Sequence, residues 1–260
     1  MAELTNRLDL ANQFTNRIAK LTRKQGDEFR SLLGNPPDPK RITSAFWERV
    51  RKQNEDEIAA ILLLIFMLSY DVHRTWGEMV PPETTEQRDA IAEKWTSKRA
   101  GAVAADLNTR SFDILNLAGR DWDVKAAAGE KIHQSQIDDV IDSIFGKGRA
   151  ERIGFTETQQ GMINGGDAGI KHAGVAVTVY WGHTGFRLPG HSGAAIRPCP
   201  ICTPREGLPE SQWGGYTIPA HIFCDCFKVI VDENDFVVGT GASGARPGNT
   251  PNKTWKFLPP

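Results

Sequence analysis

All four cysteines of this 260-residue chain lie within one short stretch, residues 197–227. They form two pairs, Cys199-x-x-Cys202 and Cys224-x-Cys226. The stretch belongs to a glycine- and proline-rich segment that has no apolar core of its own. A connection of some forty residues without regular structure is uncommon in a compact domain unless something else orders it. A fold for this chain must therefore include something that organises this loop.

A metal ion fits the spacing of the cysteines. A Cys-x-x-Cys pair can grip one face of a zinc ion, and a second pair about twenty residues later completes a tetrahedron. Here 21 residues separate Cys202 from Cys224. His221 precedes the second pair, so we favour the four thiols as ligands, with His221 as the substitute if strand geometry turns Cys224 or Cys226 away. The sequence predicts one structural Zn²⁺ ion, with five candidate ligands: Cys199, Cys202, Cys224, Cys226 and His221.

Two other uses of the cysteines stay open. Cysteine is often buried as a small hydrophobic residue, so four packed thiols are the simplest alternative to a metal. A redox role is disfavoured, because the Cys-x-x-Cys motif does not follow the strand of a βαβ unit. A disulfide is disfavoured as well. The first twenty residues lack the apolar core of a secretory signal, which predicts a cytoplasmic place of synthesis, where thiols stay reduced.

Residues 1 to about 174 predict helix after helix. A helix over residues 4–33 should end at the prolines of "GNPPDP", and a second helix should cover residues 43–79. The capping box Thr84-x-x-Gln87 predicts the start of a third helix. The apolar face of a further helix, followed by a stop at Gly146, is predicted by Ile137, Val140, Ile141 and Ile144. We expect a helical region over residues 1–146 that offers a solvated docking surface with an apolar seam.

Charge and hydropathy exclude two classes of partner for the chain as a whole. Lysine plus arginine (31) nearly balance aspartate plus glutamate (32), so no overall field draws the chain onto nucleic acid or an anionic membrane. Any contact with nucleic acid must be local. The longest apolar run, residues 58–68, is much shorter than the roughly 20 residues of a membrane-spanning helix. It predicts a buried core helix, and we expect no membrane partner.

Three glycines interrupt the helix that is predicted over residues 151–174. Gly161, Gly165 and Gly169 recur every four residues, and each costs about 1 kcal/mol against alanine inside a helix. On one helical face they would let another backbone approach closely. The alternative is a frayed or broken helix.

The pattern changes to strands after Gly174. β-branched and aromatic residues alternate in "VAVTVYW" (residues 175–181), and again in "CFKVIVD" and "DFVVG" near the end of the chain. The fold class predicted is α+β: a helical N-terminal region followed by a small antiparallel-sheet domain with a zinc-stapled loop, over residues 147–238. Residues 239–260 show no periodicity and predict an extended or mobile tail.

Three sequence pieces in a fixed order resemble the phage head-morphogenesis family, the minor head proteins similar to protein F of phage Mu. The first piece is "AERIGFTETQQGMINGG", which resembles the family's "A-x-x-I-x-x-T-E-x-x-x-A-x-N-x-G". The second is the strand ending in Trp181. The third is "CPIC" followed by "IPAHIFCDC", which resembles the family's "C-x-x-C" and "P-P-x-H-P-x-C-R-C". The match covers about 80 of the 260 residues.

The chain departs from the family in the loop before the first cysteine pair. In the family a short connection joins the tryptophan to the first cysteine pair, whereas here the residues "GHTGFRLPGHSGAAIRP" intervene. At the second cysteine pair, Phe223 and Asp225 stand where the family has a proline and an arginine. The resemblance still implies a low-copy structural component of a tailed-phage or prophage head, near the portal vertex and without a catalytic role. It implies the portal or major capsid protein as partner, possible contact with packaged DNA, and a location in the virion after assembly in the bacterial cytoplasm.

Two further classes compete with a structural protein. A zinc-stapled nuclease of the HNH type would use histidines near the cysteines, namely His183, His191 and His221, but the doublet that opens such a motif is missing. A nucleic-acid-binding zinc protein would need a basic face, for which the loop offers Arg187, Arg197, Arg205 and Lys228. Glu157 is a candidate buried catalytic carboxylate, although helix glutamates are usually solvated or salt-bridged.

Overall fold

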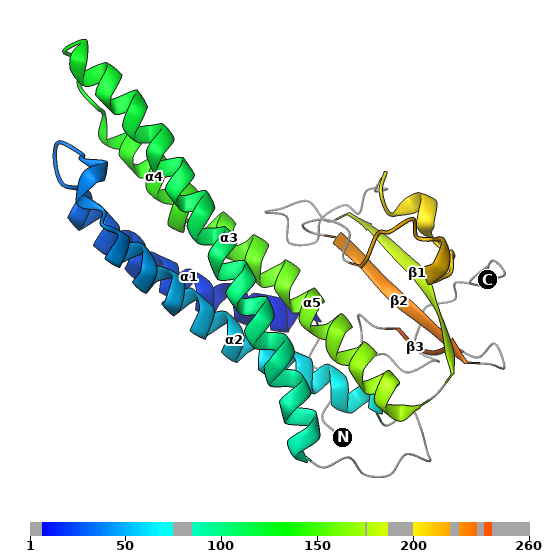
Figure 1. Ribbon diagram of the computed structural model, residues 1–260. Helices are drawn as coiled ribbons and strands as arrows, with labels where there is room; N and C mark the ends of the chain where they lie inside the picture. The colour runs from blue at the N-terminus through cyan, green and yellow to red at the C-terminus, as the bar shows by residue number, and fades with distance from the viewer. Residues whose placement is uncertain are drawn as a thin grey trace. The chain divides into compact units, whose positions relative to one another are not determined.

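The structure is a computed structural model. It describes residues 7–74, 85–174, 176–186, 200–218, 224–232 and 237–240. Over these residues the chain is mostly helical with one small antiparallel sheet, so the α+β class predicted from the sequence is confirmed (Figure 1). The longer elements are α1 Arg7–Leu33, α2 Ser44–Arg74, α3 Thr85–Ala127, α4 Gln134–Phe145, α5 Lys147–Ala173, β1 Val177–Phe186, β2 Cys224–Asp232 and β3 Val237–Thr240. No helix in the described ranges is both long and apolar enough to cross a bilayer.

The predicted helix boundaries agree closely with the structure wherever it describes them. α1 ends at Leu33, just before the proline-rich turn, and α2 begins at Ser44. α5 begins four residues earlier than expected, at Lys147. Residues 75–84, which include the expected end of the second helix and Thr84 of the capping box, lie outside the described residues.

The chain divides into two compact units, each assembled from separate segments. The first, here called the helical unit, consists of Asn12–Ile61 and Trp95–Gly154. The second, here called the mixed unit, consists of Met1–Ala11, Leu62–Lys94 and Phe155–Pro260, and holds the sheet. The boundary expected between residues 146 and 147 stays a prediction. Of the expected tail, Gly239 and Thr240 belong to β3, and residues 241–260 lie outside the described residues.

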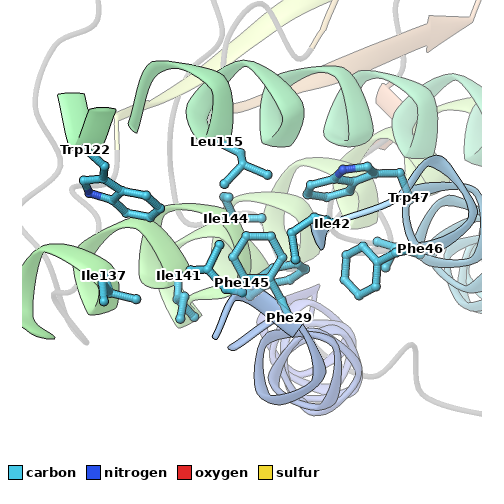
Figure 2. Packing of buried hydrophobic residues seen from close by; sticks show 12 residues of the cluster. Phe29, Ile42, Phe46, Trp47, Leu115, Trp122, Ile137, Ile141, Ile144 and Phe145 are labelled. Carbon is cyan, nitrogen blue, oxygen red and sulfur yellow. The ribbon is translucent and has the colours of Figure 1, made fainter. Parts of the chain in front are cut away.

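The helical unit is built around an aromatic cluster. The ring of Phe29 on α1 lies 5.9 Å from those of Phe46 and Trp47 on α2 and 5.3 Å from that of Phe145 on α4. Figure 2 shows these side chains pointing toward one another between the helices. The predicted apolar face of α4 is confirmed, because Ile137, Ile141 and Ile144 are buried in the same cluster. Burying a side chain of this size stabilises the fold by about 1.5–3 kcal/mol.

A buried arginine lies beside this cluster. Arg149 on α5 is 9% exposed, and its guanidinium donates to Ser111 Oγ (2.8 Å), to the carbonyl of Leu107 (2.5 Å) and to the carbonyl of Ile144 (2.7 Å). Burial lowers the pKa of Arg149 to about 10, and the nearby charge of Arg152 adds to the effect. The guanidinium thereby satisfies the carbonyl of Ile144 in the last turn of α4 and ties α3, α4 and α5 together.

In the mixed unit, the glycines of α5 allow α2 to approach closely. A Cβ at Gly165 would lie 3.0 Å from Cα of Phe66, and one at Gly161 would lie 2.9 Å from a methyl carbon of Ile65. Ser69 on α2 donates its hydroxyl to the carbonyl of Met162 at 2.5 Å. The close-packing interpretation is confirmed at these two glycines, and α5 is one continuous helix.

The sheet of the mixed unit has the order β1–β2–β3, with both pairs antiparallel (Figure 1). The prediction that the first strand ends at Trp181 is wrong, because β1 continues to Phe186. The added residues pair with the cysteine end of β2: His183 lies opposite Cys226, and Phe186 lies opposite Cys224 after a shift in register. Pairing with β2 thus extends a segment that has little strand propensity of its own.

Candidate metal centre

A buried cluster in the mixed unit brings together one cysteine from each pair. Its buried members are Ile163, Trp181, Cys202, Trp213, Ile218 and Cys226. They come from α5, from β1, from the segment 200–218 and from β2, and both cysteines are fully buried. Two thiols that are 24 residues apart in sequence therefore belong to one apolar cluster.

The other predicted ligands are not placed. Cys199 and His221 lie outside the described residues. Cys224 is the first residue of β2, but its side chain is not described. Within the described ranges no group of three or more histidine, cysteine, aspartate or glutamate side chains could hold a metal. The ligand set of four thiols, with His221 as the substitute, stays a prediction.

The segment 200–218 is ordered by its own contacts. It contains two short 3-10 helices, Thr203–Arg205 and Glu210–Gln212. The guanidinium of Arg205 donates to the carbonyls of Ile201 and Trp213 and lies 3.7 Å from the ring centroid of Tyr216. These contacts hold both ends of the segment around one side chain. Cys202, at the start of the first 3-10 helix, accepts a hydrogen bond from the backbone N–H of Arg205 at 2.9 Å.

This segment docks on the free edge of β1. The backbone of Trp181 donates to Leu208 and accepts from Gly207, both at 2.9 Å. The rings of Trp181 and Trp213 meet edge to face with their centroids 4.9 Å apart, and the indole N–H of Trp213 donates to the carbonyl of Leu208. Edge-to-face pairs stabilise by about 0.5–1.5 kcal/mol beyond the area that they bury. Cys202 is thereby fixed beside the sheet.

On the other side, α5 holds the strand that carries Cys226. Gln159 is 1% exposed and donates its Nε2 to the carbonyl of Cys226 at 2.5 Å. Lys228, two residues further along β2, is 8% exposed and binds Asp167 of α5 at 2.7 Å. Its Nζ also lies 3.6 Å from a carboxylate oxygen of Glu210, in the segment that carries Cys202. Side chains therefore tie together the helix, the strand and the loop around the two thiols.

The residues of the competing interpretations are only partly described. His183 is in β1, but its side chain is not described, and His191 lies outside the described residues, as His221 does. Arg187 and Arg197 also lie outside them. The two remaining basic residues of the loop are both engaged: Arg205 binds two carbonyls, and Lys228 is buried against acidic groups. Glu157 is buried in α5, 4% exposed.

Sequence reasoning missed Gln159 and the stacking role of Arg205. A signal for Gln159 was present, because it lies four residues before Ile163 and so shares the apolar face that meets the sheet. A polar residue on a buried helical face needs a hydrogen-bond partner. For Arg205 no sequence signal identifies Tyr216 as the ring on which it stacks.

Comparison of the chain with protein-family models, with curated proteins and with solved structures finds no match. The chemistry of the site rests on its own residues. The thiolates of Cys202 and Cys226 suit a soft or borderline cation such as Zn²⁺, at Zn–S distances of about 2.3 Å. The indole N–H of Trp181 is fully buried in the same cluster and has no acceptor among the described residues. A buried N–H donor is better suited to a negatively charged thiolate than to an apolar neighbour.

Proposed function

We propose that the chain is a structural minor head protein of a tailed phage or prophage, with one structural Zn²⁺ ion held by its cysteines. One observation supports the proposal most directly. The three sequence pieces that resemble the head-morphogenesis family each contribute to a single buried cluster: Ile163 from the helix, Trp181 from the strand, and Cys202 with Cys226 from the cysteine pairs. Separate pieces of one motif can act together only where the fold brings them into contact.

The zinc would be structural because of the ligands proposed for it. Four thiolates leave no open position for a water molecule, and zinc without such a position cannot generate the hydroxide that hydrolysis needs. When bound, the ion would cross-link the segment 200–218 to the beginning of β2. Cys202 and Cys226 would supply two of the four bonds, with Cys199 and Cys224, or His221 in place of one of them, completing the set.

The helical unit is the part proposed to dock on the portal or coat protein. Its α2 segment "SAFWERVRKQNEDE" buries Phe46, Trp47 and Val50 and exposes most of its charged side chains. Arg49 pairs with Glu28 across to α1. A rigid helical body with a charged outer face is suited to a protein–protein contact in an assembly, where complementary charge selects the partner.

Mass spectrometry of purified particles tests the assignment to the head. A head protein must be present in virions, and deletion of its gene should yield defective or non-infectious heads. Purified protein should cleave no DNA. Divalent-dependent cutting of plasmid DNA that is lost on changing His183, His191 or His221 would instead identify a zinc-stapled nuclease.

Metal analysis tests the zinc separately. Anaerobically purified protein should contain about one zinc per chain, and a chelator should lower its melting temperature. A protein without zinc, or a Cys202→Ser variant that melts like the parent, would leave the cysteines as buried thiols.

A further inference from the structure

The contact between Gln159 and Cys226 is a hydrogen bond from a helix side chain to a strand carbonyl. Gln159 is 1% exposed, and its Nε2 lies 2.5 Å from the carbonyl oxygen of Cys226. Next to this point the pairing of β2 with β1 shifts in register, between His183 and Phe186. The strand ladder is therefore irregular where the cysteines lie, and a side chain of α5 supplies a fixed point for the peptide of Cys226.

α5 is a rigid support for this contact. Ile163, one turn beyond Gln159, packs in the cluster with both cysteines. Two turns beyond Gln159, Asp167 binds Lys228 of the same strand at 2.7 Å. The glycine face of α5 packs on α2, where Gly165 leaves no room for a Cβ. A side chain anchored in this way holds its partner in one place with little loss of conformational freedom.

We propose that Gln159 is a positioning residue of the cysteine metal centre: by holding the carbonyl of Cys226, it pre-orients the thiolate of Cys226 toward the loop that carries Cys202. The proposal rests on the metal centre described above. Groups that orient metal ligands without touching the metal commonly raise affinity by 10–100-fold, because the site then needs less ordering when the ion binds. We expect Gln159 to act on metal affinity by a factor in that range.

The chain offers a matched control at the next residue. Gln160 is on the same helix and only half-buried, and its side chain bonds Asn164 on α5 rather than the strand. Gln160→Leu thus makes the same chemical change without touching β2. Gln159→Leu removes the hydrogen bond, and Gln159→Met removes the donor while keeping the length of the unbranched side chain. The second variant keeps the test valid if the first fails to fold.

The assay is anaerobic titration of full-length protein with Co²⁺, followed by displacement with Zn²⁺ in the presence of a competing chelator. Cobalt bound by thiolates gives charge-transfer absorption that reports ligand identity as well as affinity. The melting temperature of each metal-free variant is measured alongside. The expected result is metal affinity 10–100-fold weaker for both Gln159 variants and unchanged for Gln160→Leu. The metal-free variants should all melt well above the temperature of the titration, so that unfolding does not account for the difference.

Two results would overturn the inference, and they are distinguishable. If the parent binds cobalt through thiolates and the Gln159 variants bind it equally well, the metal centre stands and the positioning role is wrong. If the parent binds neither metal, the metal centre fails, and the role of Gln159 fails with it.

Discussion

Replacing Arg149 by methionine should destabilise the chain, although it removes a charge from the interior. The guanidinium donates to one hydroxyl and two carbonyls in the helical unit, on Ser111, Leu107 and Ile144. Methionine fills a similar volume but donates nothing. The substitution therefore tests whether these three hydrogen bonds outweigh the cost of burying the cation.

Two opposing contributions set the magnitude. Hydrogen bonds from a charged donor stabilise by at least about 1.5 kcal/mol each, so three of them give about 4–5 kcal/mol. Burial of the charge opposes them: the lowering of the pKa of Arg149 to about 10 corresponds to about 3 kcal/mol. The carbonyl of Ile144, left without the arginine at the end of α4, adds about 1 kcal/mol. The expected loss for Arg149→Met is about 2–3 kcal/mol, or roughly 4–12 °C in melting temperature.

Thermal and urea unfolding, followed by circular dichroism, measure this loss. Arg152→Met is the control, since Arg152 is exposed on the same helix, three residues further along. It should change stability by less than about 0.5 kcal/mol. Arg149→Lys should lose nearly as much as Arg149→Met, because an ammonium group cannot reproduce the planar fork of donors. Buried ionic groups can be replaced by apolar ones at no cost in some proteins. An Arg149→Met variant as stable as the parent would show that this is the case here and refute the reasoning.

Three further outcomes are expected. Gly165→Ala should destabilise the chain by more than about 1 kcal/mol in urea unfolding, because the new Cβ would meet the backbone of Phe66. Gly148→Ala on the same helix, where a Cβ meets open space, should stabilise it by up to about 1 kcal/mol. Equal effects of the two substitutions would contradict the close helix contact. Hydrogen bonds from Arg30 and, to a smaller extent, Gln134 lower the pKa of Asp138 in the folded chain. The ionised carboxylate therefore stabilises the fold above the pKa that Asp138 has in the unfolded chain, and this stabilisation is lost as the pH falls through the pKa of the folded chain. Arg30→Gln should raise that pKa in an NMR titration, and an unchanged value would rule out the ion pair. Arg205→Gln should increase amide hydrogen exchange over residues 200–218, since it removes the contacts to two carbonyls and one ring, and unchanged exchange would show that the segment does not depend on them.

The helices were predictable because their signals are local. Prolines after Leu33 and the i, i+3, i+4, i+7 spacing of α4 act within a few residues of the feature that they determine. The glycine repeat of α5 was also informative, since a costly residue retained at Gly161 and Gly165 indicates a neighbour that needs the space. In each case the sequence carries the reason for the structure within one element.

What the sequence did not predict depends on partners that are distant in the chain. Arg149 belongs to "KGRAER", which resembles an exposed, charged helix start, and only the carbonyls of α3 and α4 explain its burial. β1 continues beyond Trp181 because the beginning of β2, about 40 residues later in the chain, pairs with it. For the candidate site, the sequence predicts four thiols as ligands, which stays a prediction, and the structure adds that Cys202 and Cys226 share a cluster and that Gln159 contacts the peptide of Cys226.

The order of the segment 200–218 limits the role that a metal can have. Arg205 and Trp213 connect its two ends, and the backbone of Trp181 binds it to β1, through contacts that need no ion. These residues therefore share a buried cluster with β1, β2 and α5. The contribution of a metal would fall at the junction between this segment and the beginning of β2, where the strand pairing is irregular and one side chain, Gln159, holds the peptide of Cys226. A cross-link is most effective where it closes a loop between elements that are each ordered already, because little further ordering then opposes metal binding.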